Sequence, residues 1–294
     1  MRNFIKISYC GNGSQLRGGA SLQKDSTLTI NGGTFNYFVY AGAFSAGGTA
    51  VVAGDSTLVI NGGTFTTHVF GGCGASNSEN GKKTLVSGNS GVVVDSSNNT
   101  ISFDGNIYAG SIGYGNISGG TSMTFKGLGS NLTFATDSYV MGGSQMFMGT
   151  VEYVGGNKVL SFTDFTGEFG ASIKNGFTHV VINDSNVSLT SDKNVLNGIS
   201  SWSIEVASSE AELTLGNGRN SFAGDTLTLT IEDGASPSSG VWDVITGTNA
   251  TLTGWDNFSS VSIGGKAAAF ADGAWCTDTY RLYRAENTIK LASY

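Results

Sequence analysis

Carboxylates are the residues of this sequence whose spacing could support catalysis. Asp164 and Glu168 lie close together in the segment FTDFTGEFG, and Asp25 and Asp55 open two similar segments that lie 30 residues apart. Hydrolysis of a glycosidic bond needs two carboxyl groups about 5–9.5 Å apart. A polysaccharide-degrading enzyme could therefore use either pair, and Asp164 with Glu168 is the stronger candidate.

Both acidic pairs also have a structural interpretation. Asp25 and Asp55 each precede Ser-Thr, which is typical of a turn residue that hydrogen-bonds nearby backbone groups. Asp164 and Glu168 are typical of charged residues on a strand edge, where they discourage aggregation. No Arg or Lys recurs beside either pair to activate a substrate. We therefore predict that the chain is not an enzyme and has no catalytic residue.

The three cysteines, Cys10, Cys73 and Cys276, are too few and too scattered for a disulfide framework or a zinc site. Cys10 and Cys73 occupy positions that hold Ala or Gly in similar segments of the chain. They lie two such segments apart, roughly 9–10 Å if the segments stack as strands, and Cα atoms more than about 7 Å apart cannot be bridged. We predict buried or inert thiols.

The two histidines, His68 and His179, lie far apart in the chain. Two distant histidines argue against a Ser-His-Asp site and against a metal site with several histidine ligands. His68 takes the place that Phe38 holds 30 residues earlier, and His179 lies in a strand-like segment. Neither the EF-hand spacing nor the glycine-rich calcium repeat occurs. We predict no metal and no cofactor.

The charge balance weighs against nucleic acid and against membrane insertion. The net charge is −7, whereas phosphate binding requires a basic face. Lys82-Lys83 is the only adjacent basic pair, and no apolar run reaches the roughly 18 residues of a membrane-spanning helix. Met1–Lys6 is positively charged but lacks the apolar stretch of a signal peptide. We expect that the chain is a piece of a longer protein.

The elements that must position these residues are β-strands. The chain has 45 Gly, a single Pro and only 13% charged residues. Such a composition lacks the helix-forming vocabulary of Ala, Leu, Glu, Lys and Arg, and proline is excluded from interior strands. The 39% of hydrophobic residues argues against a disordered Gly/Ser linker. The composition predicts an all-β protein with many tight glycine turns.

Two spacings recur along the chain. The segment KDSTLTINGGTF at 24–35 returns as GDSTLVINGGTF at 54–65. A second signature, an aromatic residue or Met followed by a small residue and Gly, begins at each of these positions: Tyr9, Tyr40, Phe70, Tyr108 and Met141. A phenylalanine precedes the first four by five residues, as Phe4, Phe35, Phe65 and Phe103. Equivalent side chains should therefore form columns, with Phe on Phe, Ile on Ile and Asn31 on Asn61.

Alternation and period together predict the fold. Leu28 and Ile30 alternate with Thr27 and Thr29, as expected for a strand with one buried face. We expect a right-handed parallel β-helix, a β-solenoid, with coils of about 30 residues stacked about 4.8 Å apart. Residues 1–195 should form the regular part. Residues 196–294 should continue as less regular coils and an irregular C-terminal cap that contains Trp242, Trp255 and Trp275.

The chain resembles the passenger regions of Gram-negative autotransporters and related bacterial surface β-solenoid proteins. The resemblance is carried by the DST-L-x-I-NGG-TF segments, the aromatic–small–Gly signatures, the scarcity of Pro and Cys, and the closing GVWDVITGTNATLTGW and YRLYRAENTIKL segments. It implies a structural or adhesive, non-catalytic segment of a cell-surface or secreted protein. Such a segment would be a monomer that contacts glycans or proteins through its loops. Two alternatives stay open: a polysaccharide-degrading enzyme that uses Asp164 and Glu168, and a phage fibre or tail protein, which would form trimers.

Overall fold

The computed structural model describes the chain from residue 20 to residue 294 with short gaps. The described ranges are 20–45, 48–75, 83–145, 153–174, 176–192, 194–196, 198–207, 212–216, 218–220, 222–233, 235, 240–247, 252 and 254–294. Phe4, Tyr9, Cys10 and Lys82, which the sequence analysis singles out, lie outside these ranges. The chain divides into two compact units. Unit 1 comprises residues 1–124 and 133–158, and unit 2 comprises residues 125–132 and 159–294.

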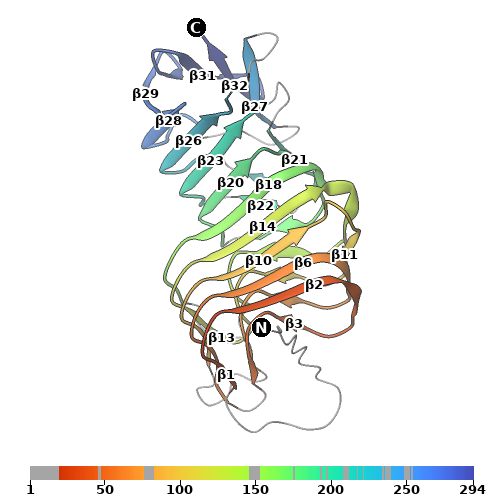
Figure 1. The fold of residues 1–294 in the computed structure, drawn as a ribbon. Coiled ribbons are helices and arrows are strands. Elements are labelled where there is room, and N and C mark those ends of the chain that lie inside the picture. The colour runs from red at the N-terminus through yellow and green to blue at the C-terminus, as the bar shows by residue number, and fades with distance from the viewer. Residues whose placement is uncertain are drawn as a thin grey trace. The chain divides into compact units, whose positions relative to one another are not determined.

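The similar segments of unit 1 form neighbouring parallel strands (Figure 1). β2 (Ser26–Phe35) pairs with β6 (Ser56–Phe65) in the register that the 30-residue spacing predicts, Ser26 opposite Ser56 and Phe35 opposite Phe65. The two ends of β6 then pair with β10 (Ser90–Asp95) and β11 (Ile101–Phe103). Alternate side chains of β6 are buried from Ser56 to Ile60, because successive residues of a strand point to opposite faces.

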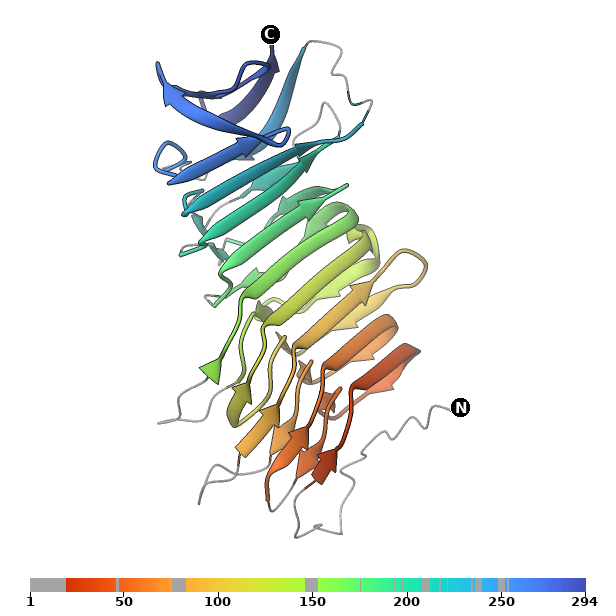
Figure 2. The ribbon, with the colours of Figure 1, turned by 60° about the vertical axis from the view of Figure 1, so that its left-hand side comes forward.

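Two further ladders of short parallel strands complete unit 1 (Figure 2). One consists of β1 (Ala20–Leu22), β5 (Ala50–Val52), β9 (Lys83–Val86), β13 (Tyr114–Ile117) and β17 (Tyr153–Val154). The other contains β3 (Val39–Tyr40), β7 (Val69–Phe70), β12 (Ile107–Tyr108) and β16 (Tyr139–Met141). β4 (Phe44–Ser45) pairs with β8 (Gly74–Ala75).

Columns of like side chains fill unit 1, as predicted. Phe35, Phe65 and Phe103 stack with ring centroids 5.0 and 5.2 Å apart. Ile30 lies opposite Ile60. The amide of Asn61 donates a hydrogen bond to Asn31 Oδ1 at 2.8 Å. In-register stacking of identical side chains thus gives both apolar contact and side-chain hydrogen bonds along the same direction.

Unit 2 is built around one long bent strand, β18 (Lys158–Phe169), of which all but Lys158 belongs to the unit. The strand bends where Asp164 adopts a φ of 51°. Its first half pairs with β20 (His179–Asn183), and its second half pairs with β21 (Asn186–Leu189). The bend therefore starts two separate parallel ladders. One ladder continues through β23 (Ser201–Val206), β26 (Thr226–Ile231) and β28 (Ser260–Ile263), and the other continues through β24 (Leu213–Leu215) and β27 (Val241–Gly247).

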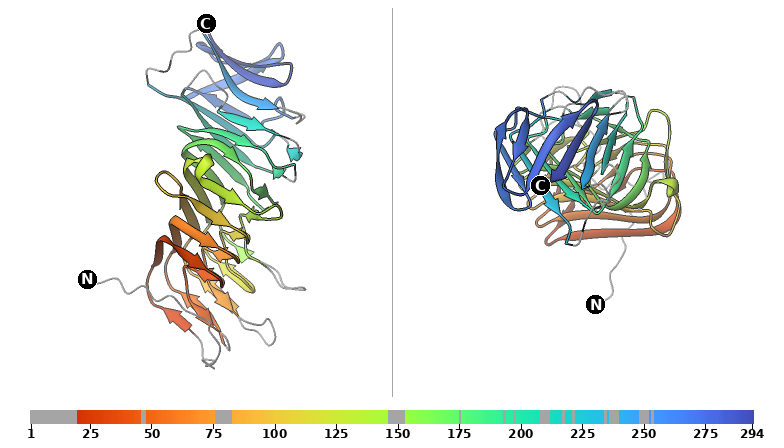
Figure 3. Two further views of the ribbon diagram at one scale, coloured as in Figure 1. Left: turned by 90° about the vertical axis from the view of Figure 1, so that its right-hand side faces the viewer. Right: turned by 90° about the horizontal axis from the view of Figure 1, so that it is seen from above.

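Antiparallel strands join the far ends of the two ladders of unit 2. β28 is followed by β29 (Lys266–Ala271), β30 (Ala274–Cys276), β31 (Tyr280–Ala285) and β32 (Thr288–Ser293), drawn in blue in Figure 3. Each pairs antiparallel with the one before it, and β32 pairs antiparallel with β27. The hydrogen-bonded strands thereby form a closed barrel of twelve: β18, β20, β23, β26, β28, β29, β30, β31, β32, β27, β24 and β21.

The all-β class is confirmed, but the prediction of a single right-handed parallel β-helix is wrong. The closed barrel and its antiparallel strands overturn it. The physical reason lies in the turns near the C-terminus. Gly264 and Gly265 have φ of 57° and 77°, and Asp272 and Gly273 have φ of 50° and 72°. Two successive residues with positive φ form the tight turn that folds a strand back on itself as a hairpin.

Six further elements are described. They are β14 (Thr121–Leu128), a 3₁₀ turn (Gly129–Asn131), β15 (Leu132–Phe134), β19 (Ser172–Ile173), β22 (Asn194–Leu196) and β25 (Gly218–Asn220). Among the described residues, none forms a helix with the length and apolar character needed to span a membrane.

Candidate functional site

Asp25 and Asp55 belong to a chain of hydrogen bonds along one corner of unit 1. Asp25 Oδ1 accepts from the backbone N–H of Asp55 at 2.9 Å, and Asp55 Oδ1 accepts from the N–H of Asn89 at 2.7 Å. Asn89 Oδ1 then accepts from the N–H of Gly120 at 2.9 Å. The Asp-Ser-Thr pattern predicts bonds to nearby backbone groups. Instead, each side chain binds the backbone of the next strand, at least 30 residues away in sequence.

Glycines make room for these side chains. A Cβ atom on Gly54 would overlap Asp25 Oδ1, and one on Gly88 would overlap Asp55 Oδ1. A Cβ atom on Gly119 would lie 2.5 Å from Asn89 Oδ1. The glycine before each of these turns is therefore required by close packing of the next side chain.

A buried hydroxyl follows each of Asp55, Asn89 and Gly120 in the chain. Ser56 Oγ donates to the carbonyl of Gly71 at 2.6 Å, and Ser90 Oγ donates to that of Ala109 at 2.5 Å. Thr121 Oγ1 donates in the same way to the carbonyl of Gly142. These hydroxyls connect the long strands to the aromatic–small–Gly segments across the interior. Sequence reasoning missed them, although the recurring Gly-Asp-Ser and Gly-Asn-Ser triplets could have indicated them.

Asp164 and Glu168 both lie on the exposed side of β18, while Phe162, Phe165 and Phe169 point inward. The Asp164 side chain is 62% exposed, and its carboxylate lies 4.0 Å from Lys126 Nζ. No Arg or Lys recurs beside this pair in the sequence, but the fold brings Lys126 close to Asp164. Lys126 belongs to β14, and its distance in sequence hid it. An exposed pair of this kind is worth about 0–1 kcal/mol.

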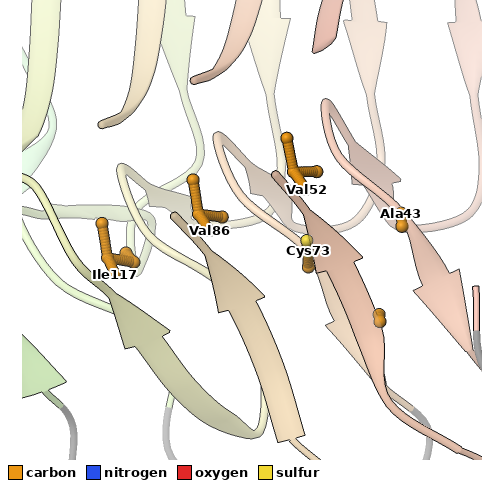
Figure 4. Close-up of a cluster of buried hydrophobic side chains, with 6 residues drawn as sticks. Ala43, Val52, Cys73, Val86 and Ile117 are labelled. Carbon is orange, nitrogen blue, oxygen red and sulfur yellow. The ribbon is translucent and has the colours of Figure 1, made fainter. Parts of the chain in front are cut away.

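The described cysteines, Cys73 and Cys276, are free thiols. Cys73 is fully buried in an apolar cluster that also contains Val52, Val86 and Ile117 (Figure 4), so the prediction of a buried thiol is confirmed for it. Burial raises the pKa of the Cys73 thiol to about 11. Cys276 is partly buried, and its sulfur accepts a weak hydrogen bond from the hydroxyl of Tyr294 at 3.6 Å.

His68 directly precedes β7 in unit 1. Its ring stacks on Phe38 with centroids 5.4 Å apart and planes 8° apart. Its Nδ1 accepts from the backbone N–H of Asn106 at 2.9 Å. Burial lowers the pKa of His68 below its ordinary value. His179 bonds the hydroxyl of Thr178 through Nδ1 at 2.9 Å.

The residues singled out from the sequence are divided between the two units. Asp25, Asp55, Cys73 and His68 lie in unit 1, whereas Asp164, Glu168, His179 and Cys276 lie in unit 2. Within the described ranges, no group of three or more His, Cys, Asp or Glu residues could hold a metal ion. No family model, curated protein or solved structure matches the chain.

Proposed function

We propose that the chain is a structural or adhesive segment of a bacterial cell-surface or secreted protein. The observation that carries this proposal is the corner chain of Asp25, Asp55 and Asn89. Carboxylates could serve catalysis, but at this corner they connect successive segments of the ladder. Their oxygen atoms accept hydrogen bonds from backbone groups, so their role is to stabilise the ladder.

The environment of the other reactive groups supports the same proposal. The Cys73 thiol is sealed in an apolar cluster, and the acceptor nitrogen of His68 is used by a backbone N–H. Asp164 and Glu168 sit on an exposed strand face. The proposed partners are glycans or proteins that contact the loops between strands.

A cleavage assay separates this proposal from the polysaccharide-degrading alternative. The purified chain is incubated with a panel of polysaccharides, and newly formed reducing ends are measured. The matched control is the double variant Asp164→Ala and Glu168→Ala. We expect no difference between the two proteins, because a structural or adhesive segment would not cleave a polysaccharide. Cleavage by the native chain that the double variant lacks would overturn the proposal.

A binding assay tests the adhesive part directly. The intact chain is passed over immobilised glycans and over immobilised extracellular matrix proteins. Saturable binding of the native chain is expected on at least one surface, and the Asp164→Ala, Glu168→Ala protein should bind equally well. Absence of saturable binding on both kinds of surface would leave a structural role without adhesion.

A further inference from the structure

His68 suggests a property beyond a structural or adhesive role. Its titratable ring is hydrogen-bonded to Asn106, a residue that connects β7, β12 and β16. The imidazole accepts a hydrogen bond from the backbone N–H of Asn106 through Nδ1, at 2.9 Å. A neutral histidine that accepts through Nδ1 carries its proton on Nε2. A second proton must therefore go onto Nδ1, where it would face the N–H of Asn106.

Asn106 is the residue through which the neighbouring strands are tied. Its backbone carbonyl accepts from the N–H of Val69 at 3.0 Å, on β7. Its side-chain Oδ1 accepts from the N–H of Tyr139 at 3.1 Å, on β16, and its Nδ2 donates to the hydroxyl of Tyr108 at 3.4 Å. The hydroxyls of Tyr108 and Tyr139 are themselves hydrogen-bonded at 2.5 Å. Asn106 thus holds β7, β12 and β16 together at their first residues.

The backbone leaves the Asn106 amide little freedom to find another acceptor. Gly105 lies so close to the preceding strand that a Cβ atom on it would overlap the Thr67 backbone and lie 2.7 Å from His68 N. The backbones of Gly105 and Thr67 are already in contact and cannot approach further. Loss of the His68 acceptor would then have to be met by separation of the strands and entry of water.

The groups that face His68 do not compensate a positive charge with a negative one. The ring is packed face to face on Phe38 and edge to face on Phe70 and Tyr108, at centroid distances of 5.4, 6.4 and 5.9 Å. The titratable group among these rings is Tyr108, whose pKa burial raises, so it carries no negative charge in acid. Among the described residues no carboxylate forms an ion pair with His68.

We propose that His68 is a pH-sensitive joint of unit 1: its protonation breaks the hydrogen bond from the Asn106 amide and loosens the β7–β12–β16 ladder. The hydrogen bond between Asn106 and His68 is present when the ring is neutral and is lost when the ring is protonated in mildly acidic solution. Burial, which lowers the pKa of His68, acts in the same direction, since the folded chain binds the proton less readily than the open one.

A neighbouring residue of the same column shows which substitution of His68 would keep the hydrogen bond and remove the titrating ring. Asn106 occupies the position after His68 in the same column, and its Oδ1 accepts the N–H of Tyr139 as His68 Nδ1 accepts the N–H of Asn106. His68→Asn should therefore keep an acceptor for the Asn106 amide without a titrating ring. His68→Phe places in the column the residue already present at Phe38, and it removes both the acceptor and the titration.

The test is amide hydrogen exchange, read by NMR on the full-length chain between about pH 8 and about pH 5. Protection of the Asn106 amide, corrected for the intrinsic exchange rate, should fall on acidification. Opening should increase about tenfold for each unit by which the pKa of closed His68 lies below that of open His68. In His68→Asn the amide should stay protected throughout, and in His68→Phe it should be unprotected throughout.

His179→Asn is the matched control, because it removes the other histidine, which lies in unit 2. It should leave the pH dependence at Asn106 unchanged. The proposal fails if protection at Asn106 is independent of pH in the native chain. It also fails if His68→Asn retains the full pH dependence, since another group would then be the titrating one.

Discussion

Asp55 shows how single side chains hold unit 1 together. Its backbone N–H donates to Asp25, and its own carboxylate accepts from Asn89 on the following strand. Each bond spans at least 30 residues of sequence, so it closes a long loop and ties two strands. A net contribution of about 0.5–1.5 kcal/mol is typical for one such bond. Each polar residue of this corner is thus hydrogen-bonded to the equivalent residue of the next segment.

Asp55→Ala should lower the free energy of unfolding by about 1 kcal/mol, because the N–H of Asn89 loses its acceptor. Urea denaturation followed by fluorescence measures the change. Asp164→Ala is the control, because its ion pair at 4.0 Å is exposed and should cost less than about 0.5 kcal/mol. Equal losses for the two variants would show that the corner bonds add nothing specific.

Gly88→Ala should destabilise more, by about 2–3 kcal/mol. The added methyl group would overlap Asp55 Oδ1 and lie 2.9 Å from the backbone of Gly54, so the strands would have to shift. Gly170→Ala is the matched control, since nothing lies within 4 Å of its added Cβ atom. Thermal unfolding of both variants compares them. A melting temperature of Gly88→Ala equal to that of Gly170→Ala would contradict the close packing described.

Cys73 should resist alkylation in the folded chain. The thiolate is the reactive form, and burial raises the pKa of this thiol to about 11, so little thiolate exists at neutral pH. Iodoacetamide labelling followed by peptide mass analysis should find Cys73 unmodified at pH about 8 in native buffer. The same residue should be modified fully in concentrated urea. Rapid labelling in native buffer would show that the apolar cluster around Cys73 opens readily.

Whole strands are held by columns of rings as well as by backbone bonds. Phe65 lies between Phe35 and Phe103, at 5.0 and 5.2 Å, and is fully buried. Aromatic pairs contribute about 0.5–1.5 kcal/mol beyond the apolar area that they bury. The column thus couples β2, β6 and β11 at one edge. In unit 2 only the strands from β28 onward among those described are joined by hairpins, with positive φ at Gly264, Gly265 and Gly273 in the first two turns.

Phe65→Ala should cost about 3–5 kcal/mol, because it leaves a cavity between two rings. Phe38→Ala, which removes a ring that is 43% exposed, should cost less than half as much. Urea denaturation of both variants provides the comparison. If the two losses were equal, burial in the column would not be what stabilises these strands.

For the molecule as a whole, the proposed segment should be monomeric. The net charge of −7 opposes self-association. Light scattering of the purified chain should give a mass near 30.3 kDa. A mass three times larger would favour the phage-fibre alternative, which requires trimers.

The sequence by itself determined the all-β class, the register of β2 on β6 and the phenylalanine column. These follow from alternation and spacing along the chain, because identical segments bring identical side chains opposite one another. Cys73 was predictable for the same reason, since it occupies a small-residue position inside a column.

Only the tertiary structure decided how unit 2 closes and which partners the polar residues take. Closure depends on four antiparallel pairings between β28 and β32 and on a fifth with β27, and the bend of β18 at Asp164 separates the ladders that they join. The partners of Asp55, Asn106 and Lys126 lie at least 30 residues away in the sequence. Spacing along the chain specifies local alternation. It does not specify which distant backbone group a side chain meets, because that depends on where each strand turns.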